Sequence, residues 1–283
     1  MKLITIDLDG TLLGTDGKIS PANVKAIQKA EEAGYKVSIS TGRSRHDTEE
    51  ILKQAALKLP ITTGNGGETY QENERLFSFT LSNGLVHEII QLLEANDMYY
   101  EVYTKDGIKA DRQKQEIIYK EMQALEHASE EKKKWAEYAL YLIGSQHGVI
   151  PTTGLSKLDY TDEGVYKIFM LSFDEDKLRE VHRVLNARTD IALTASGEEN
   201  LEVSHQDAGK GNGLKLLANH FNVSLENTFV LGDSMNDYSM FQVAGTSIAM
   251  ENAIDELKAL SSRITKTNDE NGVAYAIENY ILP

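Results

Sequence analysis

The 283-residue sequence contains no cysteine. This absence excludes a thiol nucleophile, a zinc–thiolate site and a disulfide framework, and it suits the reducing environment of the cytoplasm, where we expect the protein to act. Long apolar runs are also missing, because no stretch approaches the roughly 20 residues that a membrane-spanning helix needs. The segment that precedes Asp7 is too short for a secretory signal peptide. We therefore expect a soluble protein with no membrane partner.

Positive charge is scarce. The chain has 29 Lys and Arg residues against 44 Asp and Glu residues, which gives a formal net charge of -15. Binding to nucleic acid or to an anionic membrane needs a basic face, so we expect neither partner. An anionic small molecule could bind only where a metal ion or a local cation offsets the negative field. Nothing in the sequence indicates an obligate protein partner.

Apolar residues make up 41% of the chain, which is enough to fill the core of one large domain or two ordinary ones. The first third alternates strand and helix patterns: an apolar strand over 3–8, a helix over 20–34 and a second strand over 35–40. Short connections between them indicate a parallel sheet with helices on both faces. The last third repeats this pattern, so we predict a doubly wound α/β core.

The middle of the chain has a different pattern. An amphipathic helix is followed by short strands, a long polar stretch with helical propensity and a second amphipathic helix. A mixed pattern between two parallel-sheet segments indicates an inserted α/β domain. We place it at 83–203, and we assign 1–82 and 204–283 to a discontinuous core domain.

Acidic and hydroxyl side chains follow three of the predicted core strands. Asp7 and Asp9 end the first strand, Thr41 follows the second, and Asp233 ends the strand that begins at Thr228. In open parallel sheets, ligands bind beyond the carboxyl ends of the strands. We therefore expect these side chains to meet at one edge of the sheet. Strict alternation would turn Asp7 and Asp9 to the same side.

Clustered carboxylates repel one another unless a cation lies among them, and oxygen ligands without nearby His or Cys favour Mg²⁺. Each aspartate alone could be an ordinary turn or helix-cap residue. Their ordered placement at strand ends favours the metal site. An EF-hand is excluded because the glycine of "DLDG" comes at the fourth position, and the stretch "AGKGNG" at 208–213 lacks the spacing of a phosphate-binding P-loop.

Four ordered motifs resemble those of the haloacid-dehalogenase-type phosphatases. They are "DLDGT" at 7–11, "STGR" at 40–43, Lys210 followed by glycine, and "GDSMND" at 232–237. Three further features are similar to the Cof-type branch, which carries a type IIB α/β cap. They are "GNGG" at 64–67, the large insertion, and "NDENGVAY" at 268–275.

The resemblance implies a role for each acidic residue. Asp7 would be the nucleophile that forms an aspartyl-phosphate, and Asp9 would protonate the leaving oxygen and then activate water. Mg²⁺ would be held by Asp7, the backbone carbonyl of Asp9 and Asp233, with Asp237 supporting this arrangement. An aspartate at position 9 favours phosphate-ester hydrolysis over dehalogenation.

The resemblance also implies a phosphate-binding set formed by Thr41, Gly42, Lys210 and Asn236. Asn65 has two interpretations that are equally plausible: a substrate contact, or a turn residue that tolerates left-handed backbone.

Two arginines, Arg43 and Arg45, lie near the second motif. We expect both to pair with acidic neighbours rather than with substrate.

The leading hypothesis is a Mg²⁺-dependent phosphatase that hydrolyses a small phosphorylated metabolite, such as a sugar phosphate, flavin mononucleotide or pyridoxal phosphate. Two alternatives stay open. One is a phosphotransferase of the phosphomutase kind, which passes the phosphoryl group to a second hydroxyl. The other is a non-catalytic regulatory protein that binds phosphorylated metabolites.

Overall fold

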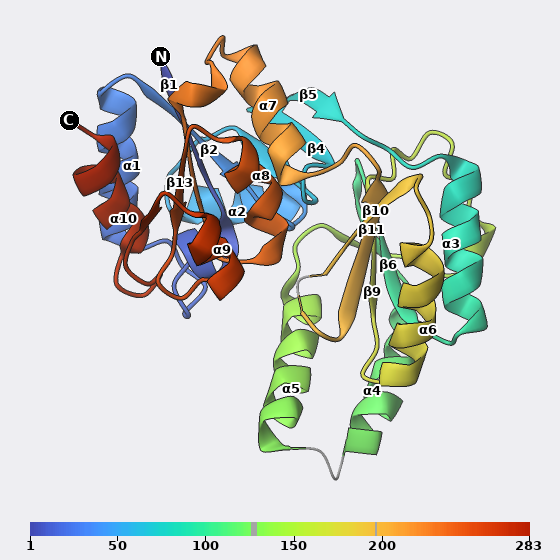
Figure 1. The fold of residues 1–283 in the computed structure, drawn as a ribbon. Coiled ribbons are helices and arrows are strands. Elements are labelled where there is room, and N and C mark those ends of the chain that lie inside the picture. The colour runs from blue at the N-terminus through green and yellow to red at the C-terminus, as the bar shows by residue number, and fades with distance from the viewer. Residues whose placement is uncertain (126–128, 196) are drawn as a thin grey trace. The chain divides into compact units, whose positions relative to one another are not determined.

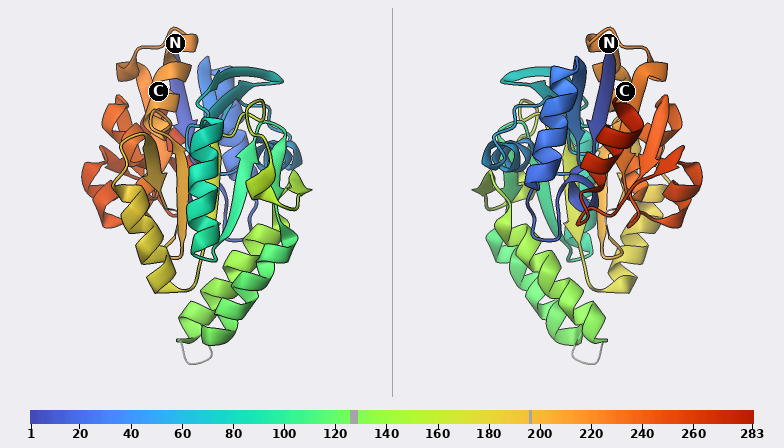
Figure 2. Two further views of the ribbon diagram at one scale, coloured as in Figure 1. Left: turned by 90° about the vertical axis from the view of Figure 1, so that its right-hand side faces the viewer. Right: turned by 90° about the vertical axis from the view of Figure 1, so that its left-hand side faces the viewer.

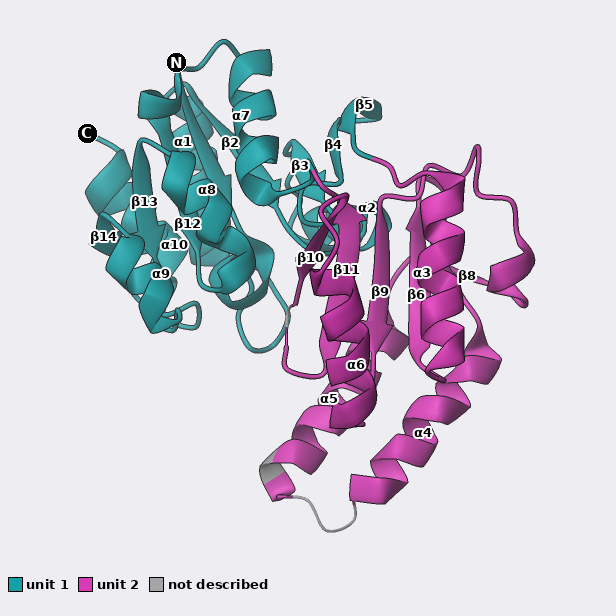
Figure 3. Ribbon diagram, turned by 45° about the vertical axis from the view of Figure 1, so that its right-hand side comes forward, with its two compact units in different colours: residues 1–79, 207–283 teal, residues 80–206 magenta. Residues whose placement is uncertain are grey.

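The computed structural model describes residues 1–125, 129–195 and 197–283. The chain divides into two compact units, one formed by residues 1–79 and 207–283 and the other by residues 80–206 (Figure 3). The helices that the structure describes include none that is both long enough and apolar enough to cross a membrane.

The first unit is built on a sheet of eight strands. Six neighbouring strands run parallel, and an antiparallel hairpin, β4–β5, extends one end of the sheet. The strands in their spatial order are β14 (Arg263–Ile264), β13 (Thr246–Ala249), β12 (Thr228–Gly232), β1 (Lys2–Ile6), β2 (Tyr35–Ser40), β3 (Ile61–Thr63), β4 (Glu68–Gln71) and β5 (Glu74–Ser78).

Helices cover this sheet. Helix α1 packs against α10, α7 packs against α8, and α8 packs against α9. The pair α1 and α10 lies in front of the strands in the right-hand view of Figure 2, whereas α7 and α8 lie across the strands from α1 in Figure 1. The bounds of the helices are α1 (Pro21–Glu32), α2 (Arg45–Gln54), α7 (Lys210–His220), α8 (Tyr238–Val243), α9 (Asp255–Leu260) and α10 (Gly272–Ala276). The predicted doubly wound α/β core is confirmed.

Local sequence determines where these elements begin and end. The Ser20 side chain accepts a hydrogen bond from the Asn23 amide, and Pro21 occupies the first helical position of α1, as the sequence predicted. Gly34 adopts a left-handed φ of 85° just after the helix ends. The first strand is shorter than expected: β1 ends at Ile6, because Leu8–Leu12 form a π-type turn instead of continuing the strand.

The second unit contains a sheet of six strands that is antiparallel except for the β7–β8 pair. The strands in spatial order are β10 (Ile191–Thr194), β11 (Asn200–His205), β9 (Lys167–Leu171), β6 (Tyr99–Thr104), β7 (Gly107–Ala110) and β8 (Val149–Pro151). The helices are α3 (Asn83–Ala95), α4 (Gln115–Ala124), α5 (Glu130–Ser145) and α6 (Glu175–Asn186).

Each face of this sheet has its own apolar core. On one face, buried residues of α3 and α6, such as Ile90 and Val181, pack against Tyr100 and Ile168 of the sheet. Another cluster joins α4 and α5 to strand and loop residues that include Tyr99. Because both faces have apolar cores, this unit has its own packed interior and does not depend on the first unit for one.

Candidate active site

Three neighbouring strands of the first unit end at the same level. In the parallel register, Ile6 of β1 lies opposite Leu231 of β12 and Ile39 of β2. The residues that follow these strands, Asp7, Asp233 and Thr41, are therefore delivered to one edge of the sheet, as the sequence predicted. The Asp7 amide continues the ladder for one more residue, since it donates to the Leu231 carbonyl at 3.0 Å.

The turn after Asp7 brings a threonine against Asp233. Gly10 adopts φ 73°, and a Cβ atom there would lie 2.4 Å from Asp233 Oδ2, so only glycine fits. The next residue, Thr11, is fully buried, and its hydroxyl donates to Asp233 Oδ1 at 2.8 Å. The sequence pattern did not single out Thr11, although it is the last residue of the "DLDGT" motif.

Lys210 lies at the centre of the acidic residues. It is the first residue of α7, its side chain is fully buried, and its ammonium donates to Asp7 Oδ1 and to Asp237 Oδ1, both at 2.6 Å. Burial acts to lower the pKa of Lys210, but the charges of Asp237 and Asp7 outweigh it and the pKa is raised. The amine therefore stays protonated, and it compensates part of the negative charge.

Asp237 is also fully buried, and it orders the loop that carries Asp233. Its second carboxylate oxygen, Oδ2, accepts from the backbone amides of Asp233 at 2.9 Å and Ser234 at 3.1 Å. A Cβ atom on Gly232 would lie 2.5 Å from this carboxylate, so the strand end must be glycine. Asp237 therefore joins Lys210 to the loop after β12.

Three carboxylates form one compact group. Asp7, Asp233 and Asp237 each offer an oxygen, and these oxygens lie within 4.8 Å of one another. Burial raises the pKa of Asp7 well above its ordinary value, with Lys210 opposing this effect. Burial and the neighbouring Asp237 raise the pKa of Asp233 to about 6. Such a set is deficient in positive charge and has oxygen donors only, so its chemistry fits Mg²⁺.

Asp9 lies apart from this group. Its side chain is 57% exposed and forms a two-pronged ion pair with Arg43, whose Nε and Nη2 donate to the two carboxylate oxygens at 2.8 Å each. Arg43 also donates to Asp47. The alternation that would turn Asp7 and Asp9 to one side does not apply, because the strand ends at Ile6 and the turn begins at Leu8.

The remaining predicted residues gather around Asn65. The Asn65 backbone is left-handed, with φ 54°, and its side-chain oxygen accepts from Asn236 Nδ2 at 3.3 Å. A Cβ atom on Gly42 would lie 3.0 Å from the same oxygen. Thr41 is buried, and its hydroxyl accepts from the Arg43 amide at 3.1 Å. The structure thus brings together Thr41, Gly42, Asn65 and Asn236. The Asn65 backbone is left-handed, and a substrate contact by its side chain stays a prediction.

Arg45 is occupied by its own neighbours. Its Nε donates to Glu49 at 2.6 Å, and its guanidinium lies over the Tyr70 ring, 4.2 Å from the centroid. Together with the pairing of Arg43, this confirms the expectation that both arginines bind acidic neighbours.

Comparison with known proteins places the chain in a family. A family model described as haloacid dehalogenase-like hydrolase matches residues 4–277. The chain is 38% identical to 5-amino-6-(5-phospho-D-ribitylamino)uracil phosphatase YwtE of Bacillus subtilis (strain 168), over 99% of this chain and 98% of the relative. It is 34% identical to Phosphatase YwpJ of the same organism, over 99% of this chain and 100% of the relative.

A solved structure of a haloacid dehalogenase-like hydrolase from B. subtilis has a TM-score of 0.84 and 33% sequence identity, and the match covers 99% of this chain and 100% of that one. The chain therefore belongs to the haloacid dehalogenase-like hydrolase family, as its four motifs predicted, and it is a phosphatase of the Cof-type branch.

Proposed function

We propose that this phosphatase is a Mg²⁺-dependent phosphomonoester hydrolase that works through an aspartyl-phosphate on Asp7. The observation that carries this proposal is the buried group in which Lys210 binds both Asp7 and Asp237, with Asp233 beside them. A buried carboxylate oriented by an ammonium is suited to attack, and it needs a second cation before an anionic phosphate can approach.

Asp7 carries the covalent step. One of its oxygens attacks phosphorus, an O–P bond forms, and the bond from phosphorus to the leaving oxygen breaks. Water then attacks the phosphorus of the acyl phosphate and regenerates the carboxylate. The ion pair with Lys210 holds the Asp7 side chain in place between these two steps.

The metal ion would be held by Asp7, Asp233 and the backbone carbonyl of Asp9, and Asp237 would support this set through Lys210 and the Asp233 amide. When bound, Mg²⁺ neutralises charge between the carboxylates and the phosphoryl group, which otherwise repel.

Asp9 moves the protons. As an acid it protonates the leaving oxygen, and as a base it takes a proton from the attacking water. In the structure this carboxylate forms an ion pair with Arg43. Its exposure leaves the carboxylate accessible to water and to a leaving group.

The phosphoryl oxygens would be bound by the Thr41 hydroxyl, the Gly42 amide, Lys210 and Asn236. These groups follow β2 or lie in the loops after β12 and at the start of α7, and fixed donors of this kind stabilise the charge that spreads over the oxygens in the transition state. Asn65 binds Asn236 and lies against Gly42, so we assign it to positioning this set.

The substrate class we propose is a small phosphorylated metabolite, a sugar phosphate or a cofactor phosphate such as flavin mononucleotide or pyridoxal phosphate. The 38% identical relative is named for a phosphorylated ribitylaminouracil, which combines a sugar-derived chain with a heterocycle. We propose that residues 83–203 act as the cap that selects the leaving group.

The test is phosphate release from a panel of sugar phosphates, cofactor phosphates and an activated aryl phosphate, with Mg²⁺ or with EDTA. We expect release that requires Mg²⁺ in the wild type and at least about a thousandfold less in Asp7→Asn, which removes the nucleophile but keeps the shape of the side chain. Release from Asp7→Asn at the wild-type rate would contradict the covalent mechanism, and no release from any compound by folded, Mg²⁺-loaded protein would contradict the hydrolase.

A further inference from the structure

The loop that follows β1 is bound at three points by side chains from the C-terminal part of the chain. Each contact joins an amide or carboxylate side chain to the backbone of the loop over residues 10–15. The three are Asn252 Nδ2 to the Gly10 carbonyl at 2.7 Å, Asn268 Nδ2 to the Leu13 carbonyl at 2.8 Å, and the Thr15 amide to Asp269 Oδ1 at 2.8 Å.

Asn252 differs from the other two because both ends of its amide are used. Its Nδ2 donates to Gly10, and its Oδ1 accepts from the Asn268 backbone amide at 3.0 Å. The two bonds fix which end of the amide faces Gly10. A donor is required there, so aspartate, which has the same shape, cannot replace it.

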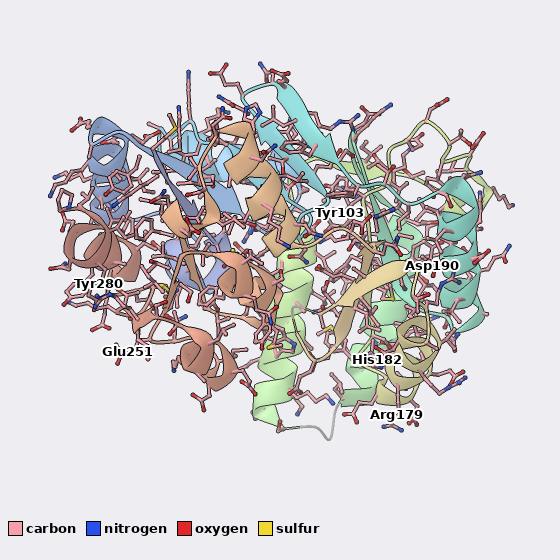
Figure 4. The ribbon with its side chains drawn as sticks, turned by 45° about the horizontal axis from the view of Figure 1, so that its top comes forward. Tyr103, Arg179, His182, Asp190, Glu251 and Tyr280 are labelled. Carbon is pink, nitrogen blue, oxygen red and sulfur yellow. The ribbon has the colours of Figure 1, made fainter. Side chains whose placement is uncertain are left out.

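The backbone on either side of Asn252 binds the end of β12 and the loop that follows it. The Met250 amide donates to the Gly232 carbonyl, and the Ile254 amide donates to the Asp233 carbonyl, both at 3.0 Å. The segment 250–254 therefore contacts the turn after β1 and the loop after β12. Glu251, which precedes Asn252, is labelled in Figure 4 and lies in the C-terminal part of the first unit.

We propose that Asn252 is a positioning residue for the phosphatase reaction. By fixing the Gly10 carbonyl, it sets the orientation of the turn between Asp9 and Thr11, and through the adjoining backbone it fixes that turn relative to Asp233. This inference rests on the proposed function, and it assigns a task to an exposed asparagine outside the four motifs. Groups of this kind, which orient those that hold a metal or a reacting atom, typically change affinity or activity by 10–100-fold when lost.

A purely structural role predicts a different outcome, and two variants distinguish the roles. If Asn252 served only to anchor the 266–271 turn, Asn252→Asp would retain activity, because its carboxylate still accepts from the Asn268 amide. Asn252→Ala, which lacks this acceptor, would lose activity. If Asn252 positions Gly10, Asn252→Asp must lower activity at least as much as Asn252→Ala, because it places a carboxylate against the Gly10 carbonyl.

The experiment measures kcat and KM on an aryl phosphate at saturating Mg²⁺, together with the Mg²⁺ dissociation constant by calorimetry. We expect both variants to lower kcat by about 10–100-fold with KM within about threefold, and Asn252→Ala to weaken Mg²⁺ binding by about tenfold. The matched control is Asn279→Ala. Like Asn252→Ala it removes a bond from an exposed asparagine to a backbone carbonyl, here that of Tyr275, but Asn279 contacts neither the turn after β1 nor the loop after β12. It should match the wild type.

A folded Asn252→Asp with wild-type kcat would overturn the inference. Should either variant unfold at the assay temperature, Asn252→Ser replaces it under the same expectations, because the shorter serine hydroxyl cannot reach the Gly10 carbonyl. The calorimetry does not depend on turnover. If the wild type hydrolyses no compound, the proposed function fails while Mg²⁺ binding still decides the inference: unchanged binding in Asn252→Ala would then overturn it.

Discussion

Lys210 shows how one residue controls the electrostatics of the site. It lies between two buried carboxylates, in a protein whose formal net charge is -15. Removing one partner of a buried ion pair leaves an uncompensated charge in a low-dielectric interior, which costs more than the pair itself contributes. The same ammonium is proposed to bind the phosphoryl group, so stability and catalysis depend on it together.

We predict that Lys210→Met loses about 3–5 kcal/mol of unfolding free energy at pH 7 in EDTA, because Asp7 and Asp237 lose their cation. Urea denaturation followed by circular dichroism measures this difference. The control is Lys215→Met on the same helix, which is exposed and should change stability by less than about 0.5 kcal/mol. Equal effects of the two substitutions would contradict the assignment.

At the scale of elements, the turn between β1 and the first helix determines where the carboxylates lie. The tight Leu8–Leu12 turn is possible because Gly10 adopts a left-handed conformation and presents no side chain to Asp233. Thr11 then binds the Asp233 carboxylate from within the turn. The geometry of the acidic group is therefore a property of this turn rather than of the strands alone.

Two glycines offer a matched test of this turn. Gly10 and Gly17 have the same φ of 73°, but a Cβ atom on Gly17 would meet nothing within 4 Å. We expect Gly17→Ala to cost about 1 kcal/mol, the price of left-handed backbone, and Gly10→Ala to cost at least about 2 kcal/mol more and to abolish phosphate release, because Asp233 must move. Denaturant titration and the phosphate assay measure both. Similar losses in the two variants would show that the contact with Asp233 is unimportant.

Elements with strong local patterns were predictable from sequence, and elements defined by distant contacts were not. The Ser20 cap and Pro21 predicted the start of α1, and the apolar runs separated by helices predicted the parallel sheet. The β4–β5 hairpin was missed, because its strands carry charged residues and its turn uses Glu72 at φ 53° instead of glycine. Motifs identified Asp7, Lys210 and Asp233 as neighbours. The hydrogen bonds of Thr11 and Asn252 could not be predicted, because each joins residues that are distant in the sequence.

At the scale of the whole molecule, the acidic group and the predicted cap belong to different units. Asp7, Asp233 and Asp237 all lie in the unit formed by residues 1–79 and 207–283, so that unit alone holds the carboxylates of the proposed metal site. A ligand stabilises the structure that binds it, and local protection reports where it binds. The role of residues 83–203 in selecting the leaving group stays a prediction.

We predict that Mg²⁺ slows amide hydrogen exchange in residues 7–13 and 232–238, and leaves strand β6 (Tyr99–Thr104) of the other unit unchanged. The reason is that bound metal suppresses local opening of the loops whose carboxylates hold it. Exchange monitored by mass spectrometry, with Mg²⁺ or EDTA, checks this directly. If Mg²⁺ slowed exchange in β6 as much as in the two loops, its effect would not be local to the acidic group.

The ion pair between Lys210 and Asp7 joins residues that are 203 positions apart. During synthesis at the usual rates, Asp7 leaves the ribosome roughly 10–40 s before its partner does. Until then, the Asp7 carboxylate that follows β1 has neither its cation nor the neighbouring strand β12. The intervening unit, residues 80–206, is complete before Lys210 is made, so it can fold first. The proposed site is therefore incomplete until residues 210–237 emerge.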